Sequence, residues 1–433
     1  MCLHASVLSL SFPRLISLHE RPGYFVPLAT LPSHAAAGLA SANTSDGRTL
    51  LVLANFWGGA SHVFAFAGGA LTKLQELPTD MAHDWEIARL SDGRTHAIVA
   101  NYGGAVSTVY QLSDPRVPPP EPLPPPPCSD QHAACRDWQT AGECAHNPTF
   151  MREQCQQSCG SCAAPGAGPF VPVQLLPTEA ASAAHHFVVR TAGGPSRDFL
   201  LVAQRRVALF EFDPQAAQWR LFLQTNATGI CEFASCEAPS GEAVLVFAQW
   251  HAGGTFRTAS AVYAFDPAAS QPLQLLQELP TLGAHDAECF TVEGGEGSET
   301  LLAIANVRDD ASQRVSSAIY RLDGRALVEA QRLDTVGAHD LEPLWAGGRR
   351  LLAVANQGDG TSCNASVDVY AHAPRGWELL QSLPTGCCVY VHSFRDRGRL
   401  LLGAAVERIG SEPAQADTYR TDSLVFEWIE QTY

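Results

Sequence analysis

Short apolar stretches recur along the whole chain in a fixed order. Each unit opens on an alternating stretch that ends in a Leu-Pro-Thr-like sequence, as in LQLLQELPT from Leu273. A second stretch follows, then a nearly continuous apolar run such as LLAIAN, and then an alternating stretch such as SAIYRL. These runs are rich in Val, Leu, Ile and aromatic residues and are bounded by Gly, Asp, Asn and Pro, so they predict strands rather than helices. The continuous run is typical of a strand buried on both faces.

Seven such units can be laid over one another. They begin at Phe25, Leu71, Phe170, Trp219, Leu273, Leu327 and Trp377. Four short strands in roughly 45–55 residues is the period of a β-propeller blade, and propellers have about four to eight blades. The sequence therefore predicts an all-β fold, a seven-bladed β-propeller.

The phase of the repeat suggests how the ring closes. We expect the second, third and fourth stretches of a unit to be the inner strands of one blade, and the opening stretch to be the outer strand of the preceding blade. Residues 25–31 would then complete the last blade beside residues 423–428, which removes the open edge of the ring. The alternative, that each repeat is a complete blade, stays open at this stage.

The spacing between the second and third units is about twice the others and indicates an insertion. A proline-rich stretch, DPRVPPPEPLPPPP, is expected to form a semi-rigid polyproline II stalk before a cysteine-rich module. The predicted organisation is listed in chain order: 1–24, an N-terminal segment and signal-peptide candidate; 25–112, repeats one and two; 113–127, linker; 128–162, small disulfide-rich domain; 163–169, linker; 170–433, repeats three to seven.

Cysteine usage and charge restrict the environment and the partners. Six of the 13 Cys fall between Cys128 and Cys162, which indicates disulfides and an oxidising compartment. The N-terminal apolar stretch is interrupted by Pro13 and Arg14, so it is a weak signal-peptide candidate: either this start is imperfect or the true leader is missing. The net charge of −16 argues against nucleic acid and anionic membrane as partners, and no apolar run is long enough for a transmembrane span. The chain is expected to be secreted or on the cell surface, with possible glycosylation at Asn43, Asn226 and Asn364.

Three units carry the sequence His-Asp-x-Glu at the start of the predicted innermost strand. Residues two apart in a strand project to the same side, so six carboxylates would point toward the ring axis. They are Asp84, Glu86, Asp286, Glu288, Asp340 and Glu342. Close carboxylates either raise one another's pKa or attract a cation, and oxygen ligands favour Ca²⁺. The alternative is that these acids accept hydrogen bonds from the neighbouring blade and lock the ring.

The histidines of the same motif are His83, His285 and His339. Each lies one position from an Asp and is therefore expected to point to the other side of the strand. Three His can ligate zinc, but the favoured interpretation is hydrogen bonding between blades. Asn residues that end the apolar runs are interpreted as turn residues bonded to local backbone. They are Asn55, Asn101, Asn306 and Asn356.

The motif Gly-Ala-His-Asp-x-Glu, preceded by Leu-Pro-Thr and followed by LLAVAN and Ser-x-Val-Tyr, resembles the EPTP (epilepsy-associated, EAR) repeat. The match is best in the units containing His83, His285 and His339, and the other four units lack His-Asp-x-Glu. The resemblance implies a secreted, non-enzymatic protein-interaction propeller with an ion in its central channel.

The inserted module is similar to the ShKT (sea-anemone toxin-like) domain. The matching positions are Cys128, Asp130, Cys135, Trp138, Gly142, Cys144, Asn147, Pro148, Met151, Cys155, Ser158, Cys159 and Cys162. Sequence alone allows 15 pairings of six Cys. The resemblance implies Cys128–Cys162, Cys135–Cys155 and Cys144–Cys159. Thr149 and Phe150 stand where the toxins of this family carry a channel-blocking Lys-Tyr pair, which argues against a channel modulator.

The favoured function is a secreted or cell-surface interaction protein that binds a protein or glycan partner through the propeller, with the ShKT module as a second contact. The alternative is a cation-dependent propeller hydrolase that uses the channel carboxylates. No Gly-x-Ser-x-Gly nucleophile signature is present. Cys289 is expected to be buried. The sequence leaves two other pairings open: Cys231 with Cys236, and Cys363 with Cys387 or Cys388. Together with Cys2 they make an odd number.

Overall fold

The structure is a computed structural model of the chain. It describes residues 23–430 apart from 58, 120, 124–129, 131, 148–150, 152–153, 156, 160–167, 191–193, 295–296 and 411–415. The signal-peptide candidate, Cys2, and the expected Cys128–Cys162 bridge therefore lie outside the described residues. Within the described part of the chain no helix is long and apolar enough to cross a membrane.

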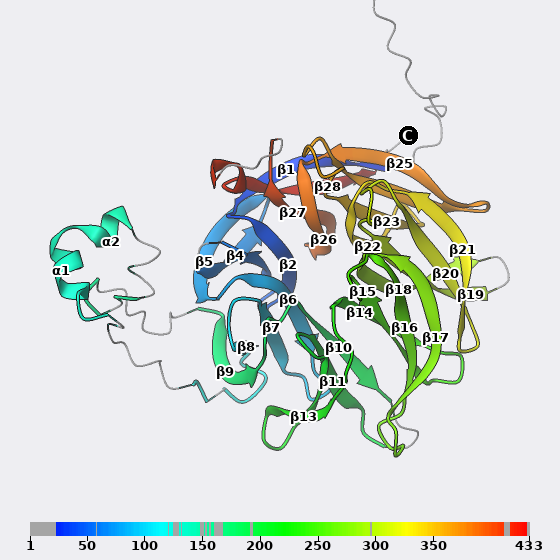
Figure 1. Ribbon diagram of the computed structural model, residues 1–433, viewed down its shortest axis with the longest axis horizontal. Coiled ribbons are helices and arrows are strands. Elements are labelled where there is room, and N and C mark those ends of the chain that lie inside the picture. Colours follow the sequence, from blue (N-terminus) through cyan, green and yellow to red (C-terminus); the bar gives the residue numbers. More distant parts are fainter. Residues whose placement is uncertain are drawn as a thin grey trace, which may run out of the picture.

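Seven four-stranded antiparallel sheets stand around a central axis and confirm the predicted all-β, seven-bladed propeller (Figure 1). Blade 1 contains β2 (Ala36–Asn43), β3 (Thr49–Asn55), β4 (Ala60–Ala67) and β5 (Ala70–Pro78). Blade 2 contains β6 (Ala82–Arg89), β7 (Thr95–Asn101), β8 (Val106–Leu112) and β9 (Phe170–Pro177). Blade 3 contains β10 (Ala183–Val189), β11 (Arg197–Ala203), β12 (Ala208–Asp213) and β13 (Gln218–Gln224).

The remaining blades follow the same order from the axis outward. Blade 4 contains β14 (Ile230–Glu237), β15 (Ala243–Gln249), β16 (Arg257–Phe265) and β17 (Leu273–Leu282). Blade 5 contains β18 (Ala284–Gly294), β19 (Gly297–Asn306), β20 (Ser316–Asp323) and β21 (Ala326–Asp334). Blade 6 contains β22 (Ala338–Ala346), β23 (Arg349–Asn356), β24 (Ser366–Ala373) and β25 (Gly376–Pro384), and blade 7 contains β26 (Cys387–Asp396), β27 (Arg399–Arg408), β28 (Asp422–Glu430) and β1 (Gly23–Pro32). A short 3₁₀ helix, η2 (Ala416–Tyr419), precedes β28.

Both ends of the described chain meet in blade 7. The N-terminal strand β1 pairs antiparallel with β28, with Phe25 opposite Trp428 and Leu31 opposite Ser423. The predicted closure is therefore confirmed, and the alternative that each repeat is a complete blade is wrong. A strand from one end of the chain fills the edge that the other end leaves open, so the ring has no unpaired seam.

The hydrophobic core is divided among the seven blade junctions. Each of seven clusters of buried side chains joins two neighbouring sheets; for example, Leu51 of β3 and Leu401 of β27 belong to the cluster between blades 1 and 7. Every sheet is thus covered on both faces. This explains the nearly continuous apolar runs, because the second strand of a blade has no face in contact with water, and all seven residues of β3 are buried.

A glutamine in the outer strand clamps one blade to the next at five junctions. Its side-chain amide donates to a backbone carbonyl at the start of the neighbouring outer strand and accepts from the N–H of the same residue, as Gln277 does with Leu327. The five glutamines are Gln75, Gln174, Gln277, Gln331 and Gln381. The Gln of the L-x-L-Q-x-L stretch is therefore a blade-to-blade contact.

Asparagine and threonine side chains tie the loops at the channel end of several blades. The side chain of Asn306 accepts from the N–H of Leu282 at 3.0 Å and donates to the carbonyl of Ser316 at 2.9 Å. Asn55, Asn101 and Asn356 make the equivalent two bonds. The prediction of local backbone bonding is confirmed. The Thr of Leu-Pro-Thr lies within hydrogen-bond distance of the Ser of the alternating strand, as in Ser260 with Thr281 at 3.0 Å.

The cysteine-rich insert interrupts blade 2 between its third and fourth strands. Leu112 at the end of β8 pairs with Phe170 at the start of β9, so the insert leaves and re-enters the propeller at one point. Its two short helices, α1 (Cys135–Thr140) and α2 (Glu143–His146), lie outside the ring beside this blade (Figure 1).

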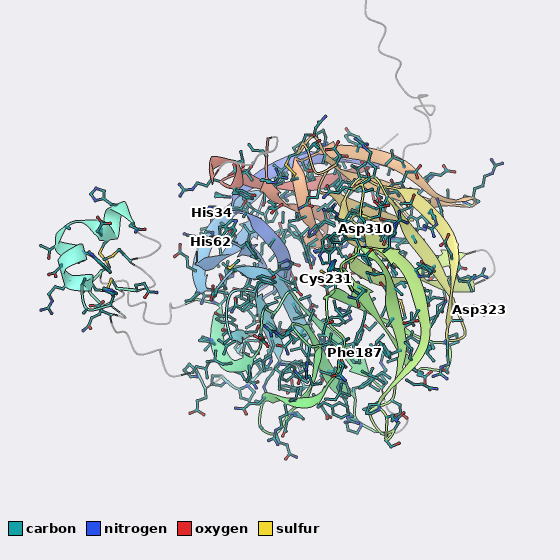
Figure 2. All side chains as sticks on the ribbon, viewed as in Figure 1. His34, His62, Phe187, Cys231, Asp310 and Asp323 are labelled. Atoms are coloured by element: carbon teal, nitrogen blue, oxygen red, sulfur yellow. A yellow bond between two sulfur atoms is a disulfide. The ribbon has the colours of Figure 1, made fainter. Side chains whose placement is uncertain are left out.

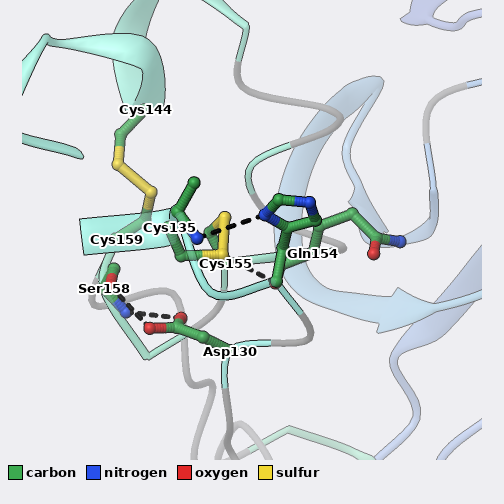
Figure 3. Close-up of a disulfide and its surroundings, with 9 residues drawn as sticks. Asp130, Cys135, Cys144, Gln154, Cys155, Ser158 and Cys159 are labelled. Atoms are coloured by element: carbon green, nitrogen blue, oxygen red, sulfur yellow. Dashed lines mark hydrogen bonds between the residues drawn. A yellow bond between two sulfur atoms is a disulfide. The ribbon is translucent and has the colours of Figure 1, made fainter. Parts of the chain in front are cut away.

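The insert has a very small core that covalent bonds support. The bridges Cys135–Cys155 and Cys144–Cys159 are formed, and both are pairings that the resemblance implies (Figure 3). Asp130 accepts from the backbone N–H of Ser158 at 2.9 Å and from its hydroxyl at 2.6 Å, which links two of the motif positions. Met151 is buried against the first bridge. Bridges of this kind each contribute about 2–4 kcal/mol where burial is insufficient.

Candidate binding site at the mouth of the central channel

A β-bulge at the start of the inner strand brings both the His and the Asp of the motif to the channel. In β6 the pairing with β7 shifts between Ala82 and Asp84, so His83 is the extra residue, and β18 and β22 shift in the same way at His285 and His339. The expectation that these His point away from the channel is wrong, because a bulge breaks the two-residue alternation of a strand. His83 and Asp84 line the same cavity.

A left-handed residue precedes the inner strand of every blade. Glycine takes this conformation in four blades, as at Gly283 and Gly337, where the Gly-Ala-His-Asp sequence begins. In blades 1, 2 and 3 the residue is Ala35, Met81 or Ala180, with φ of 49°, 50° and 52°. This turn directs the chain into the channel mouth, and a residue with a Cβ is strained there by about 1–2 kcal/mol.

The three histidines form the floor of the mouth and are joined from blade to blade. His285 Nδ1 lies 3.1 Å from the carbonyl oxygen of His339, and His339 Nδ1 lies 2.9 Å from that of Val389. His83 makes the corresponding backbone bond to Ser182. A carbonyl only accepts, so Nδ1 carries the proton. Burial lowers the pKa of all three imidazoles, that of His339 to about 3, so the rings are neutral at pH 7.

Above this floor lies a cavity of about 620 Å³ with aromatic walls. Trp250 meets the His285 ring edge-on at 5.6 Å, and Phe56 packs on His83 and Tyr102 with centroid distances of 6.1 Å. Tyr102 is 46% exposed, and Trp57 beside Phe56 is 44% exposed. The mouth is thus an open pocket with aromatic faces on its sides and imidazoles at its base, and Figure 2 shows Cys231, another lining residue, near the ring axis.

The predicted carboxylates lie below the histidines and bond to the neighbouring blade. Asp84 accepts from the backbone N–H of Ala184 at 3.2 Å, Asp286 from that of Leu341 at 2.8 Å, and Asp340 from that of Val391 at 2.7 Å. One layer deeper, Glu342 accepts from the N–H of Ser393 at 3.0 Å and Glu86 from that of His186. These five acids therefore bond one blade to the next, as the hydrogen-bonding interpretation expects, and cation binding stays a prediction.

Burial raises the pKa of every one of these acids, and repulsion between several of them adds to the shift. The pKa of Asp84 rises to about 6, those of Asp286 and Glu342 to about 7, and that of Glu86 to about 8. Burial, together with the charges of Asp286 and Glu342, raises the pKa of Glu288 well above its ordinary value. Asp340 behaves in the same way, with burial as the main cause. The six predicted residues thus share one electrostatic environment around the axis.

Sequence reasoning missed three residues of this layer. Glu232 of β14 occupies the Asp position of blade 4, and burial, reinforced by the Asp84 and Asp286 charges, raises its pKa. Tyr390 of β26 takes the same position in blade 7 and faces the acids. Gly38 takes it in blade 1, where a Cβ would lie 3.1 Å from the Cα of Asp84. Aligning the bulges residue by residue, with Cys231–Glu232 under His-Asp, would have found all three.

The expected calcium site among these acids stays a prediction. Among the residues that the structure describes, no three His, Cys, Asp or Glu side chains come together in a way that could hold a metal ion. One oxygen of each hub aspartate is committed to a backbone N–H. The smaller cavity between the histidines and the acids, about 20 Å³, has room for one water-sized group. Asp84 Oδ1 is buried and completes no hydrogen bond.

The remaining cysteines form one bridge that the sequence analysis considered, Cys363–Cys387, and one that it did not, Cys236–Cys289. Cys236 of β14 is bonded to Cys289 of β18, which ties blade 4 to blade 5, and Cys363 is bonded to Cys387. The Cys231–Cys236 alternative is therefore wrong. Cys231 and Cys388 are free thiols, and Cys289 is half-buried rather than buried. The three candidate glycosylation residues are all exposed: Asn43, Asn226 and Asn364.

Comparison with known proteins separates the insert from the propeller. Residues 127–162 match the family described as ShK domain-like. The sequence is 50% identical over 46 residues to peroxidase mlt-7 of Caenorhabditis elegans, and this match covers 11% of this chain and 6% of that protein. It is 39% identical over 51 residues to peroxidase skpo-1 of the same organism, which covers 12% and 8%. The matches span less than a tenth of these relatives and lie in the ShK region.

The propeller resembles solved structures in fold alone. Two proteins described as a "putative 6-phosphogluconolactonase", from Bacteroides uniformis and Bacteroides fragilis, each superimpose with a TM-score of 0.51 at 12% identity. The first superposition covers 84% of this chain and 90% of that protein, and the second covers 83% and 89%. The chain is therefore a seven-bladed β-propeller that carries an ShK domain-like insert.

Proposed function

We propose that this protein is an extracellular binding module that captures a protein or glycan partner at the channel mouth. The observation that carries the proposal is the open cavity of about 620 Å³, which joins aromatic walls to a floor of neutral imidazoles. Concave, largely apolar sites with a few placed polar groups are typical ligand sites. Four disulfides in the described residues fit an oxidising, extracellular environment.

The chemistry of the lining residues favours binding over covalent catalysis. The Ser182 hydroxyl lies 3.4 Å from the carbonyl of Ile230 and 3.5 Å from that of Ala203, so it donates to backbone rather than to a base. Burial raises the pKa of the Cys231 thiol, which keeps it protonated and weakly nucleophilic. An activated nucleophile needs a base within hydrogen-bond reach or a lowered pKa, and neither residue has one.

The ShK domain-like insert is proposed as a second contact for the same partner or for a neighbouring one. It is attached where β8 and β9 meet, at the outer part of blade 2, and its stalk begins with a run of prolines. Two linked binding sites gain avidity from effective concentration when both can engage together. We also propose that the repeats belong to the EPTP/EAR type, since the bulged His-Asp pair and the left-handed residue before it recur at equivalent positions.

Hydrolysis of a lactone is the competing function, suggested by the names of the two Bacteroides proteins. A phosphorylated substrate needs cationic partners, and Arg205, which lines the mouth, is already paired with Glu179 at 2.7 Å. The test is to incubate the pure protein with 6-phosphogluconolactone and simple esters, with and without divalent metal. If the protein hydrolyses one of these substrates faster than the uncatalysed rate, and if His285→Asn abolishes this activity, then the function is catalysis and not binding.

Partner capture is the direct test of the binding proposal. The secreted protein would be used for proximity labelling on cell surfaces and for glycan arrays, alongside Trp250→Ala and a form in which a short turn replaces residues 113–169. Pairing of Leu112 with Phe170 makes that deletion compatible with the blade. We expect Trp250→Ala to lose the main partner and the deletion to weaken it. A partner that binds both variants as well as the parent would refute the mouth as the site.

A further inference from the structure

The floor of the mouth presents hydrogen-bond acceptors. His285 and His339 use their Nδ1–H groups on carbonyl oxygens of the next inner strand, and His83 bonds to the backbone of Ser182. A neutral imidazole with its proton on Nδ1 has a lone pair on Nε2. No described residue donates to these Nε2 atoms, and the three rings line one cavity. Three acceptors are thus available to whatever enters from above.

The rings lie close enough to act on one group. The centroids of His83 and His285 are 6.1 Å apart in a stacked arrangement, and those of His285 and His339 are 3.4 Å apart. Below them the smaller cavity of about 20 Å³ has room for one water-sized group. An ammonium group is of this size and has N–H donors directed to several sides.

The surroundings of the floor favour positive charge. Trp250, Phe56 and Tyr102 line the cavity, and a cation that lies over an aromatic ring is attracted to it. Asp84 lies directly below, with its Oδ1 buried and without a hydrogen bond. An unpaired buried carboxylate oxygen is costly, so a cation above it is stabilised.

The other charged groups around the mouth do not oppose this. Glu232, Asp286 and Asp340 line the smaller cavity and bring no positive charge to it. In the upper cavity Glu407 accepts from Gln357 at 3.0 Å. Arg205 is the basic group of the lining, and its ion pair with Glu179 offsets its charge.

We propose that the channel mouth binds a primary ammonium group carried on an aliphatic stem, as in a lysine side chain of a protein partner. The ammonium donates to the Nε2 atoms of His83, His285 and His339, and the stem packs against Trp250 and Phe56. This inference rests on the proposed binding function and specifies its ligand. Three directed acceptors distinguish a primary ammonium from a quaternary one, which has no N–H to donate, and from an alcohol of equal length, which carries no charge.

The experiment measures binding of small probes to the full-length protein by ligand-observed NMR at pH 7.5 in EDTA. The probes are n-butylammonium, tetramethylammonium, 1-butanol, glucosamine and a blocked lysine amide. We expect n-butylammonium and the lysine amide to bind at least tenfold more tightly than the alcohol and tetramethylammonium, since hydrogen bonds to a charged group are the strong ones. Tighter binding of glucosamine than of the lysine amide would move the source of the ammonium from a protein to an amino sugar and overturn the lysine assignment.

One substitution separates the acceptor from the structural hydrogen bond. In His285→Asn the amide N–H can replace Nδ1–H toward the carbonyl of His339, while the Nε2 acceptor is lost. We expect at least tenfold weaker binding of n-butylammonium with an unchanged melting temperature. The matched control is His251→Asn, because His251 is an exposed histidine that meets Phe256 edge-on outside the cavity lining. This variant should bind like the parent.

Several results would overturn the inference. Equal binding of alcohol and ammonium, tighter binding of tetramethylammonium, or unchanged binding by His285→Asn would each show that the imidazoles are not the acceptors. Zinc or calcium that binds without EDTA and is displaced by none of the amines would assign the site to a metal. If the amines fail but a protein partner still requires Trp250, the binding function stands and only its ligand class falls.

Discussion

Raising the pH from 7.0 to 8.0 should weaken the fold, because the buried acids at the hub hold protons that the unfolded chain releases. Burial raises the pKa of Glu86 to about 8 and those of Glu288 and Asp340 well above their ordinary values. Unfolded carboxyl groups are ionised above about pH 5. The folded protein therefore binds more protons than the unfolded chain. The stability contributed by these groups is fully present at low pH and is lost as the pH rises through their folded pKa values.

The size of the effect follows from the number of extra protons. Each proton that only the folded state holds lowers the free energy of unfolding by about 1.4 kcal/mol per pH unit. The acids are strongly coupled, so we count one proton for the group and expect a loss of at least about 1.4 kcal/mol between pH 7.0 and 8.0. The hub histidines contribute little in this window because their pKa values are lowered and the unfolded chain's histidines are also mostly neutral.

The assay is urea unfolding followed by tryptophan fluorescence at both pH values in EDTA. Glu288→Gln removes one proton-binding group and should flatten the pH dependence, whereas Glu278→Gln, an exposed acid on β17, should leave it unchanged. Stability that is constant or rises from pH 7.0 to 8.0 would refute the reasoning. Recovery of the lost stability on adding Ca²⁺ at pH 8.0 would show that a cation binds among the acids.

Three further substitutions test the contacts between blades and the turn into the channel. Gln277→Leu removes both hydrogen bonds between the Gln277 side chain and the backbone of Leu327. The free energy of unfolding, measured by urea titration, should fall by about 2–4 kcal/mol. An unchanged midpoint of the urea transition would mean that water replaces these bonds. Replacing Cys236 and Cys289 together by Ser opens a bridge between residues 53 positions apart. The free energy of unfolding should fall by about 4 kcal/mol, because the unfolded chain gains entropy. A fall of less than about 1 kcal/mol would contradict this expectation. Ala180→Gly should raise stability by about 1 kcal/mol in a thermal melt because φ is 52° there; a lower melting temperature would show that the residue is unstrained.

Much of the architecture follows from the linear pattern. A strand covered on both faces must be apolar throughout, so the runs such as residues 301–306 mark the second strand of each blade. The phase of the repeat then predicts that residues 25–31 close the ring. The insert could be recognised as well, because its cysteine spacing is set by a core too small to stand without bridges.

The arrangement at the hub was predicted only in part. Strand alternation places Asp84 and Glu86 toward the axis, but it assigns His83 to the opposite side. The bulge that turns His83 into the channel depends on pairing between β6 and β7. Alternation within one strand does not include the extra residue that a bulge adds.

The sequence by itself determined the number of blades, the closing strand and the acids near the axis, because these depend on local periodicity and on repetition. The tertiary structure decided which cysteines join, where the protons of His285 and His339 lie and which backbone groups the acids bond. Those outcomes depend on which atoms of two different blades lie within hydrogen-bonding or bonding distance. Residues about 50 positions apart, such as His285 and His339, meet only after the ring has closed.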